Sequence, residues 1–266
     1  MLLSKFIFII KRIFLCTTTG RNVNCGNDSS LIKGGSQNPI CDKIVKKYFA
    51  LFRNEKIMHP EIGQEWQEIY NDKGNIIYGQ DGALLCPVDA IKIKGTNNRV
   101  FLSRDSNVKK LIFSIQGNNN KIFIGSATKL AGVASISGRD RKLIISNKTT
   151  FHDVAIFIKE QCDVYIGEDC MFSAKIEIRT SDSHSIFELD TQKRINKPGC
   201  VYIDDHVWLG KEVIVSKGVY IAKDCIVGAK SFVNKSLLEP NAIYAGCPAK
   251  RIRGGVNWTR KLLPFD

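Results

Sequence analysis

The chain has 266 residues, 44% of them hydrophobic, which is enough for one large buried core plus an accessory segment. Lysine and arginine (39) outnumber aspartate and glutamate (26), and the net charge of +13 favours anionic partners: nucleic acid, a membrane surface, a phosphorylated cofactor or an acidic polysaccharide. The nine cysteines contain no C-x-x-C pair, so we expect free thiols in a reducing compartment and no metal–thiolate site.

Residues 1–39 read as an amphipathic segment followed by a polar linker. The apolar run LLSKFIFIIKRIFL contains Lys5, Lys11 and Arg12, and it is shorter than the roughly 20 residues that a membrane span needs. It also lacks a small-residue cleavage site, so a secretory signal is not expected. As a helix, this run would pack on the protein itself or on a neighbouring subunit, and a peripheral membrane anchor is the alternative.

Residues 40–88 are predicted to form an α-helical cap. Ile44, Tyr48, Leu51 and Phe52 recur with helical spacing, and a second, shorter helix is expected at residues 60–70, with Pro60 at its start. A solenoid leaves an apolar end exposed, and helices of this kind commonly cover it.

A repeat of six residues dominates the C-terminal half. Over residues 201–237, aliphatic or small residues return at every sixth position in two registers offset by two. Coils built from three short strands have this period, so we predict an all-β solenoid, a parallel β-helix spanning residues 89–254 with a tail at 255–266. The first register is Ile203, Leu209, Val215, Ile221, Val227 and Val233, and the second is Val201, Val207, Val213, Val219, Cys225, Ser231 and Leu237.

Earlier coils are less regular and end in an interruption. The inward aliphatic position recurs at Leu102, Ile124, Ile145 and Ile166. Projected further, the register reaches His184 and then Asp190, and neither belongs in an apolar core. We therefore predict that residues at about 180–200 leave the coil as a protruding loop, the kind of place where a rigid scaffold carries its function.

Several motifs resemble those of one enzyme family. They are IEIRTSDSHSIFELDTQKRIN at 176–196, VYIDDHVWLG at 201–210, IVGAKSFVNKS at 226–236, IYAGCPAKRI at 243–252 and VNW at 256–258. This combination resembles the hexapeptide-repeat O-acetyltransferases of bacterial capsule and lipopolysaccharide biosynthesis. Asp204 departs from the glycine that is usual there. The resemblance implies a left-handed coil, which spacing alone does not indicate.

The resemblance also implies the chemistry. It implies transfer of an acetyl group from acetyl-CoA to a hydroxyl of a cell-surface polysaccharide or its sugar precursor, by direct attack with His184 as general base. Asp182 would orient His184, with a plain surface carboxylate as the alternative. With Val207 and Leu209 inward, Trp208 points outward and is expected to shape the acceptor and thioester site.

The expected donor site combines small residues at coil corners with nearby cations. The small residues would let the pantetheine arm lie against backbone amides, and the cations would meet the phosphates. Together with Trp208, the residues concerned are Gly210, Lys211, Ala222, Gly228, Ala229, Lys230, Lys235, Gly246, Lys250 and Arg251. His206 also points outward; we expect a structural role for it, with a catalytic role as the alternative.

The resemblance further implies a cytoplasmic homotrimer, at most in contact with the inner face of the membrane through the N-terminal segment. A zinc carbonic anhydrase on the same scaffold is disfavoured, because the four histidines show no pair spaced for ligation from one turn. No metal and no nucleic acid are expected as partners. The alternative from a different class is a non-catalytic scaffold or polysaccharide-binding module.

Overall fold

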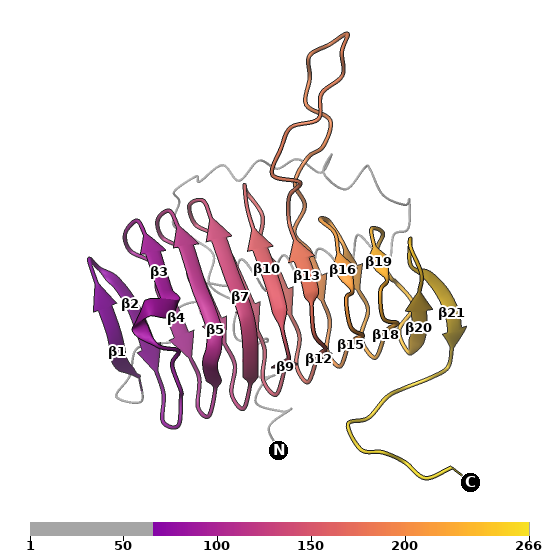
Figure 1. The fold of residues 1–266 in the computed structure, drawn as a ribbon, viewed down its shortest axis with the longest axis horizontal. Coiled ribbons are helices and arrows are strands. Elements are labelled where there is room, and N and C mark those ends of the chain that lie inside the picture. The colour runs from indigo at the N-terminus through magenta and orange to yellow at the C-terminus, as the bar shows by residue number, and fades with distance from the viewer. Residues whose placement is uncertain (1–65, 266) are drawn as a thin grey trace, which may run out of the picture. The chain divides into compact units, whose positions relative to one another are not determined.

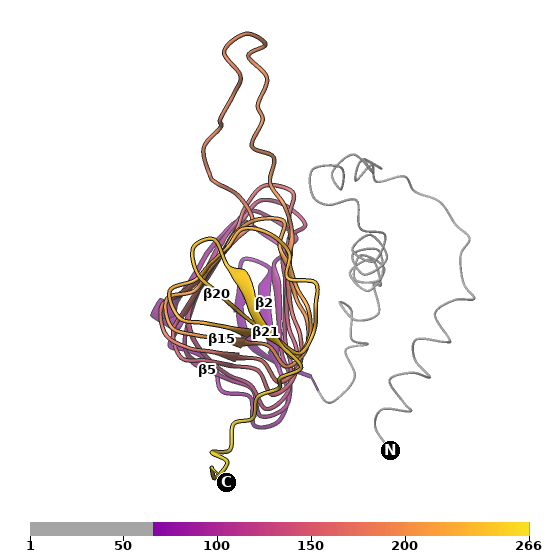
Figure 2. The ribbon, with the colours of Figure 1, turned by 90° about the vertical axis from the view of Figure 1, so that its right-hand side faces the viewer.

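A computed structural model describes residues 66–265. In these residues the chain forms an all-β solenoid, and the helical element among them is the 3₁₀ turn η3 (Val88–Ala90). Seen along the coil axis, the strands enclose a three-sided core (Figure 2). The predicted all-β solenoid is thus confirmed for this region, where no helix is long and apolar enough to cross a bilayer. The predicted amphipathic segment at 1–39 and residues 40–65 of the predicted cap lie outside the described residues.

One sheet forms the first side of the solenoid (Figure 1). After an antiparallel β1–β2 hairpin, each strand from β2 onward pairs in parallel with the equivalent strand of the next coil, so this side records seven successive coils. In spatial order the strands are β1 (Gln67–Asp72), β2 (Asn75–Gly79), β4 (Arg99–Leu102), β6 (Lys121–Ile124), β8 (Lys142–Ile145), β11 (Val164–Ile166), β14 (Val201–Ile203) and β17 (Tyr220–Ile221).

A second sheet bends round the other two sides. Its second-side strands are β9 (Thr150–Phe151), β12 (Met171–Phe172), β15 (Trp208–Leu209), β18 (Ile226–Val227), β20 (Ala242–Ala245) and β21 (Lys250–Gly254). Its third-side strands are β3 (Ile91–Lys94), β10 (Val154–Ile158), β13 (Ile176–Arg179), β16 (Ile214–Val215) and β19 (Phe232–Val233). The long strands β5 (Asn107–Gln116) and β7 (Lys129–Ser137) run along both sides. Gly132 allows the bend in β7, since its φ of +124° and its contact with Val154 leave no room for a Cβ.

The core follows the registers read from the sequence. Leu102, Ile124, Ile145, Ile166 and Ile203 pair strand to strand, and all are fully buried. Both six-residue registers of the later coils point inward and are buried, Ser231 included. Its hydroxyl donates to the Gly228 carbonyl at 2.6 Å, which satisfies the polar group inside the core.

The solenoid begins earlier than the sequence predicts. Residues 67–88 were expected in the helical cap, but they contain β1, β2 and the start of the first coil. The helix predicted to reach Tyr70 is therefore wrong from Gln67 onward. Side chains of β2 alternate between buried and half-buried, and Ile77 fills the same core as the later coils. Pairing with β4 decides the structure here, and local helical spacing does not.

Three edges join the three sides, and two of them matter for the site. We call the corner between the third and first sides the loop edge, because residues 180–200 leave the coil there. The corner between the first and second sides, which includes residues 204–207, is the tail edge, because the C-terminal tail runs past it. In both views the loop and the tail project from opposite edges (Figures 1 and 2).

Candidate active site

Residues 180–200 form a narrow projecting loop between β13 and β14. Phe187 and Arg194 make an antiparallel bridge, and the Ile195 amide donates to the Ile186 carbonyl at 2.8 Å. The two arms therefore pair with each other as the loop leaves the coil (Figure 1). This pairing between the two arms gives the long loop a defined conformation.

Asn196 ties the two arms together at the base of the loop. Its side chain is buried, with the residue 9% exposed. Its Nδ2 donates to the His184 carbonyl at 2.7 Å and to Asp182 Oδ2 at 2.8 Å. Its Oδ1 accepts from the Ile186 amide at 2.8 Å and from Arg194 Nε at 3.0 Å. One amide side chain thus holds the backbone at His184 and Ile186 and the carboxylate of Asp182.

Two ion pairs fasten the loop to neighbouring coils. Arg194 donates to Glu160 through both terminal nitrogens, at 2.7 and 2.9 Å, a bidentate geometry that specifies orientation. Lys217, one coil further on, donates to Asp182. The Arg194 hydrogen bond lowers the pKa of Glu160 from 4.5 to about 2. The Lys217 hydrogen bond likewise lowers the pKa of Asp182, so both anchors stay ionised near neutral pH.

His184 is exposed on this anchored loop. Its carbonyl is held, as described above, while its imidazole faces solvent. Asp182, which the sequence assigns to orienting the imidazole, instead accepts from Lys217 and Asn196. The link from Asp182 to His184 therefore runs through the Asn196 side chain to the His184 backbone.

Trp208 lies at the other candidate position, on the outer face of β15. It is 37% exposed, and its ring meets the Trp258 ring at 6.0 Å between centroids with a 50° tilt. Trp258 also stacks on His206 at 4.2 Å and donates from Nε1 to the His206 carbonyl at 2.8 Å. His206 Nδ1 lies 2.9 Å from Asp224 Oδ1. His206 therefore anchors the C-terminal tail.

The two candidate catalytic residues sit at different edges of the coil. His184 belongs to the loop edge, whereas Trp208 follows the tail edge directly. The whole first side lies between them, a path of about 20 Å of extended chain at roughly 3.3 Å per residue. A single copy of the coil therefore does not bring His184 and Trp208 together.

The predicted donor-binding residues are also divided among several places. Gly210, Lys211, Gly228, Ala229 and Lys230 cluster at the third edge, between the second and third sides. Outside this cluster, Ala222 lies buried at the tail edge, Lys235 follows β19, and Gly246, Lys250 and Arg251 belong to the β20–β21 hairpin.

The glycines of the third edge serve coil stacking. The Gly210 amide donates to the Val227 carbonyl and the Gly228 amide to the Tyr244 carbonyl, each at 2.8 Å. A Cβ on Gly210 would lie 2.7 Å from the Ala229 nitrogen, so the close approach is to the next coil. These two amides are therefore occupied, and an anionic ligand here would meet lysine side chains instead.

Known proteins with related sequences share an activity in their names. No family model matches the chain. A protein of Neisseria meningitidis named polysialic acid O-acetyltransferase is 36% identical over 172 residues, which are 65% of this chain and 80% of that protein. The chain belongs to the hexapeptide-repeat O-acetyltransferases. It is accordingly an acyltransferase. Another polysialic acid O-acetyltransferase, from Escherichia coli O1:K1, is 32% identical over 47% of this chain and 40% of its own length.

Solved structures agree with this membership of the O-acetyltransferases. The polySia-specific acetyltransferase NeuO superposes with a TM-score of 0.59 and 32% identity, over 64% of this chain and 78% of that one. The polysialic acid O-acetyltransferase OatWY gives a TM-score of 0.50 and 31% identity, over 65% and 92% of the two chains.

Sequence reasoning missed the residues that hold the loop of this O-acetyltransferase. Asn196 and Arg194 stand at the end of the motif at 176–196, so the motif contains them without revealing their contacts. Glu160 and Lys217 come from flanking coils, 34 and 35 residues from their partners. Their signal is positional, since both stand at the loop edge in coils that neighbour the interruption.

Proposed function

We propose that this enzyme transfers an acetyl group from acetyl-CoA to a hydroxyl of an acidic cell-surface polysaccharide or its sugar precursor. The observation that carries the proposal is that His184 is exposed on a loop whose attachment to the coil is held in place by hydrogen bonds and ion pairs. Two relatives named polysialic acid O-acetyltransferases support the acceptor class, and the net charge of +13 suits a polymer with a carboxylate on each sugar. The free thiols fit a reducing cytoplasm, and family membership supports left-handed coiling.

The proposed reaction is direct acyl transfer. The neutral His184 imidazole takes the proton of the acceptor hydroxyl as its oxygen attacks the thioester carbonyl. The tetrahedral intermediate then collapses, the C–S bond breaks, and the CoA thiolate leaves with the proton from His184. The products are an acetyl ester and CoA. Asp182 is a positioning residue in this scheme, because it acts on His184 through Asn196.

For the donor, we place the CoA phosphates among the lysines of the last coils. Lys211 and Lys230 are exposed and share Glu212 at 3.8 and 3.6 Å, which keeps both ammonium groups at the third edge. Lys250 is exposed on the adjacent hairpin. Trp208 offers a half-exposed ring on the neighbouring side, where the acetyl-bearing end of the donor would pack.

We further propose that the active site lies between two subunits of a homotrimer. His184 and Trp208 belong to different edges, so a second copy must supply one of them. The projecting loop also carries four large exposed apolar side chains, which a second subunit would cover. They are Ile186, Phe187, Leu189 and Ile195, with exposed fractions of 55%, 48%, 81% and 54%.

The test is CoA release with polysialic acid as acceptor, compared between wild type and His184→Ala. Losing a general base should lower kcat by about 10²- to 10⁴-fold. His152→Ala is the matched control, since His152 is also exposed but lies between β9 and β10. Full activity of His184→Ala would contradict the mechanism. A wild-type protein that binds the polymer but never releases CoA would favour the polysaccharide-binding module instead.

A further inference from the structure

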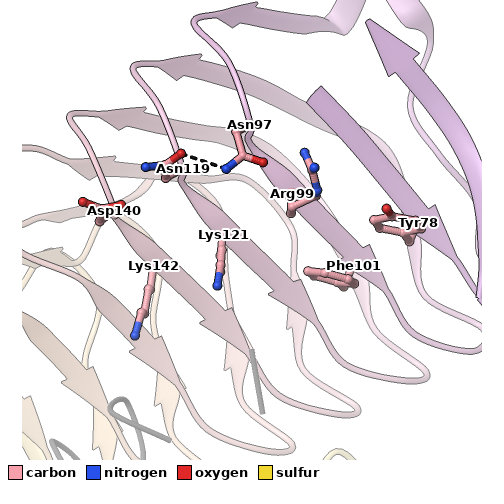
Figure 3. A pocket seen from close by; sticks show the side chains of 8 residues that line it. All are labelled: Tyr78, Asn97, Arg99, Phe101, Asn119, Lys121, Asp140 and Lys142. Atoms are coloured by element: carbon pink, nitrogen blue, oxygen red, sulfur yellow. Dashed lines mark hydrogen bonds between the residues drawn. The ribbon is translucent and has the colours of Figure 1, made fainter. Parts of the chain in front are cut away.

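A cleft of about 420 Å³ opens on the first side, in the N-terminal coils (Figure 3). The mechanism proposed above uses none of its residues. Three cations, two aromatic rings, two amides and one carboxylate line it. They are Arg99, Lys121, Lys142, Tyr78, Phe101, Asn97, Asn119 and Asp140.

The three cations form a row across adjacent strands. Arg99 pairs with Lys121, and Lys121 pairs with Lys142, on the parallel strands β4, β6 and β8. Successive members are therefore spaced by about 4.8 Å along the solenoid. The residue after each one is buried in the core, so all three charged side chains lie on the outer face, where Lys121 and Lys142 run the same way and Arg99 runs the opposite way (Figure 3). Side chains of one sign in such a row create a positive potential that attracts anions.

The Arg99 guanidinium and the aromatic rings at the same end of the cleft are both held in place by neighbouring groups. Arg99 Nη1 donates to the Gly74 carbonyl at 2.6 Å, which uses one of its three nitrogens and fixes the plane of the group. Tyr78 stacks on Phe101 with ring centroids 5.3 Å apart and planes 13° apart. Trp66 meets the same Phe101 edge-on at 5.7 Å. A ring pair fixed in this way presents a flat surface to an apolar ligand face.

The cleft lies along the loop edge, as does His184. Asn97, Asn119 and Asp140 occupy equivalent left-handed corner positions in successive coils, and Asn97 donates to Asn119 at 2.9 Å. The next such position is Glu160, which holds Arg194 of the His184 loop. Only β11 separates β8 from β14, so the near end of the row is about 10 Å along the axis from the strand where the loop returns.

We propose that this cleft is a second, non-catalytic site for a carboxylate-bearing stretch of the acceptor polysaccharide. This second proposal rests on the proposed function, because an acidic polysaccharide is the acceptor in that function. The row of cations would pair with sugar carboxylates, and the Tyr78–Phe101 pair would support the apolar face of a ring. Asp140 and the two amides suit sugar hydroxyls, which donate hydrogen bonds. A DNA backbone has no free sugar hydroxyl that could donate to Asp140, so a polysaccharide is the better match.

A polymer held in the cleft would raise the local concentration of acceptor hydroxyls at His184. The advantage requires a chain long enough to span the distance between the two. Long polysialic acid should therefore gain from the cleft, and a sialic acid dimer should not.

The test compares Arg99→Gln/Lys121→Gln/Lys142→Gln with the matched control Lys109→Gln/Lys110→Gln/Lys129→Gln. The control removes the same charge from exposed lysines of β5 and β7, on other sides of the coil. We expect the cleft variant to lose at least about fivefold in kcat/KM on long polysialic acid and nothing on the dimer. An equal loss on both acceptors, or in both variants, would overturn the proposal.

Two further measurements keep the outcome clear. Lys121→Glu/Lys142→Glu leaves the structural contact of Arg99 intact and should reproduce the loss if the cleft binds carboxylates. Binding of polysialic acid to His184→Ala protein, with and without the cleft substitutions, needs no catalysis. If the cleft substitutions weaken that binding while wild-type protein shows no acetyl transfer either, the cleft stands and the proposed function fails. Tighter binding of duplex DNA than of polysialic acid, abolished by the same substitutions, would overturn the assignment.

Discussion

At the scale of single residues, Asn196 holds the backbone at His184 in place. Its amide makes four hydrogen bonds, to both arms of the loop and to Asp182. A buried amide with all its partners is worth more than any one surface contact, because losing it leaves several groups unsatisfied. The side chain touches no atom that reacts in our proposed scheme, so we assign it the role of a positioning residue.

We expect Asn196→Ala to lower kcat by roughly 10- to 100-fold, since about 1 kcal/mol for each of a few lost hydrogen bonds loosens the His184 backbone. KM for acetyl-CoA should stay within about twofold, because the donor site is elsewhere in our scheme. Steady-state kinetics would separate the two constants. Asn234→Ala, at an exposed asparagine of the last coil, is the control. A rise in KM with unchanged kcat would show that Asn196 does not position His184.

At the scale of elements, the loop depends on charges contributed by the coils on either side. Arg194 and Asp182 are in the loop, while Glu160 and Lys217 are at the loop edge of flanking coils. Exposed ion pairs usually contribute little, but a bidentate pair restricts orientation strongly. The anchors therefore set the direction in which the loop projects more than the stability of the solenoid.

The lowered pKa of Glu160 predicts how this anchor responds to acid. Because the folded pKa is about 2 and the ordinary value is 4.5, its stabilising contribution is complete above pH 4.5 and disappears as the pH falls toward 2. Pepsin cleavage within residues 180–200 can measure this, with Glu160→Gln as reference. The variant should be cleaved faster than wild type near pH 4.5, and the two rates should converge near pH 2. A ratio that stays constant over this interval would contradict the anchoring by Glu160.

At the scale of the whole molecule, the division of the site between two edges has the widest consequence. His184 projects from the loop edge and Trp208 lies beyond the tail edge, so the site that we propose, which combines them, needs two copies of the coil. A closed trimer would form three such sites from one kind of contact. The apolar loop tip and the basic cleft would then serve different partners, the neighbouring subunit and the acceptor polymer.

Mixed assemblies test this arrangement. His184→Ala and Trp208→Ala should each be nearly inactive alone. Co-assembled in equal amounts, they should recover up to about a quarter of wild-type activity, because one site in four would combine an intact His184 with an intact Trp208 from the neighbour. CoA release by the co-purified mixture is the measurement. No recovery in a mixture shown by mass spectrometry to contain both chains would place the two residues in the same subunit's site.

The sequence by itself determined the inside and outside of the solenoid. A period of six residues forces Ile203, Leu209 and their repeats inward, and the break at His184 follows from the same register, because an imidazole cannot continue an apolar core. The outward direction of Trp208 was predictable for this reason. The sequence motifs also indicated the acetyltransferase family.

Only the tertiary structure decided which outward residues share an edge. Two residues with the same orientation can be a whole side apart, as His184 and Trp208 are, and the predicted donor residues fall at several separate places. The contacts of Asn196 and Glu160, and the strands at residues 67–79, depend on pairing between coils. The physical reason is that the repeat specifies local direction, whereas coil stacking brings together residues 20 to 35 positions apart, and no local pattern records those hydrogen bonds.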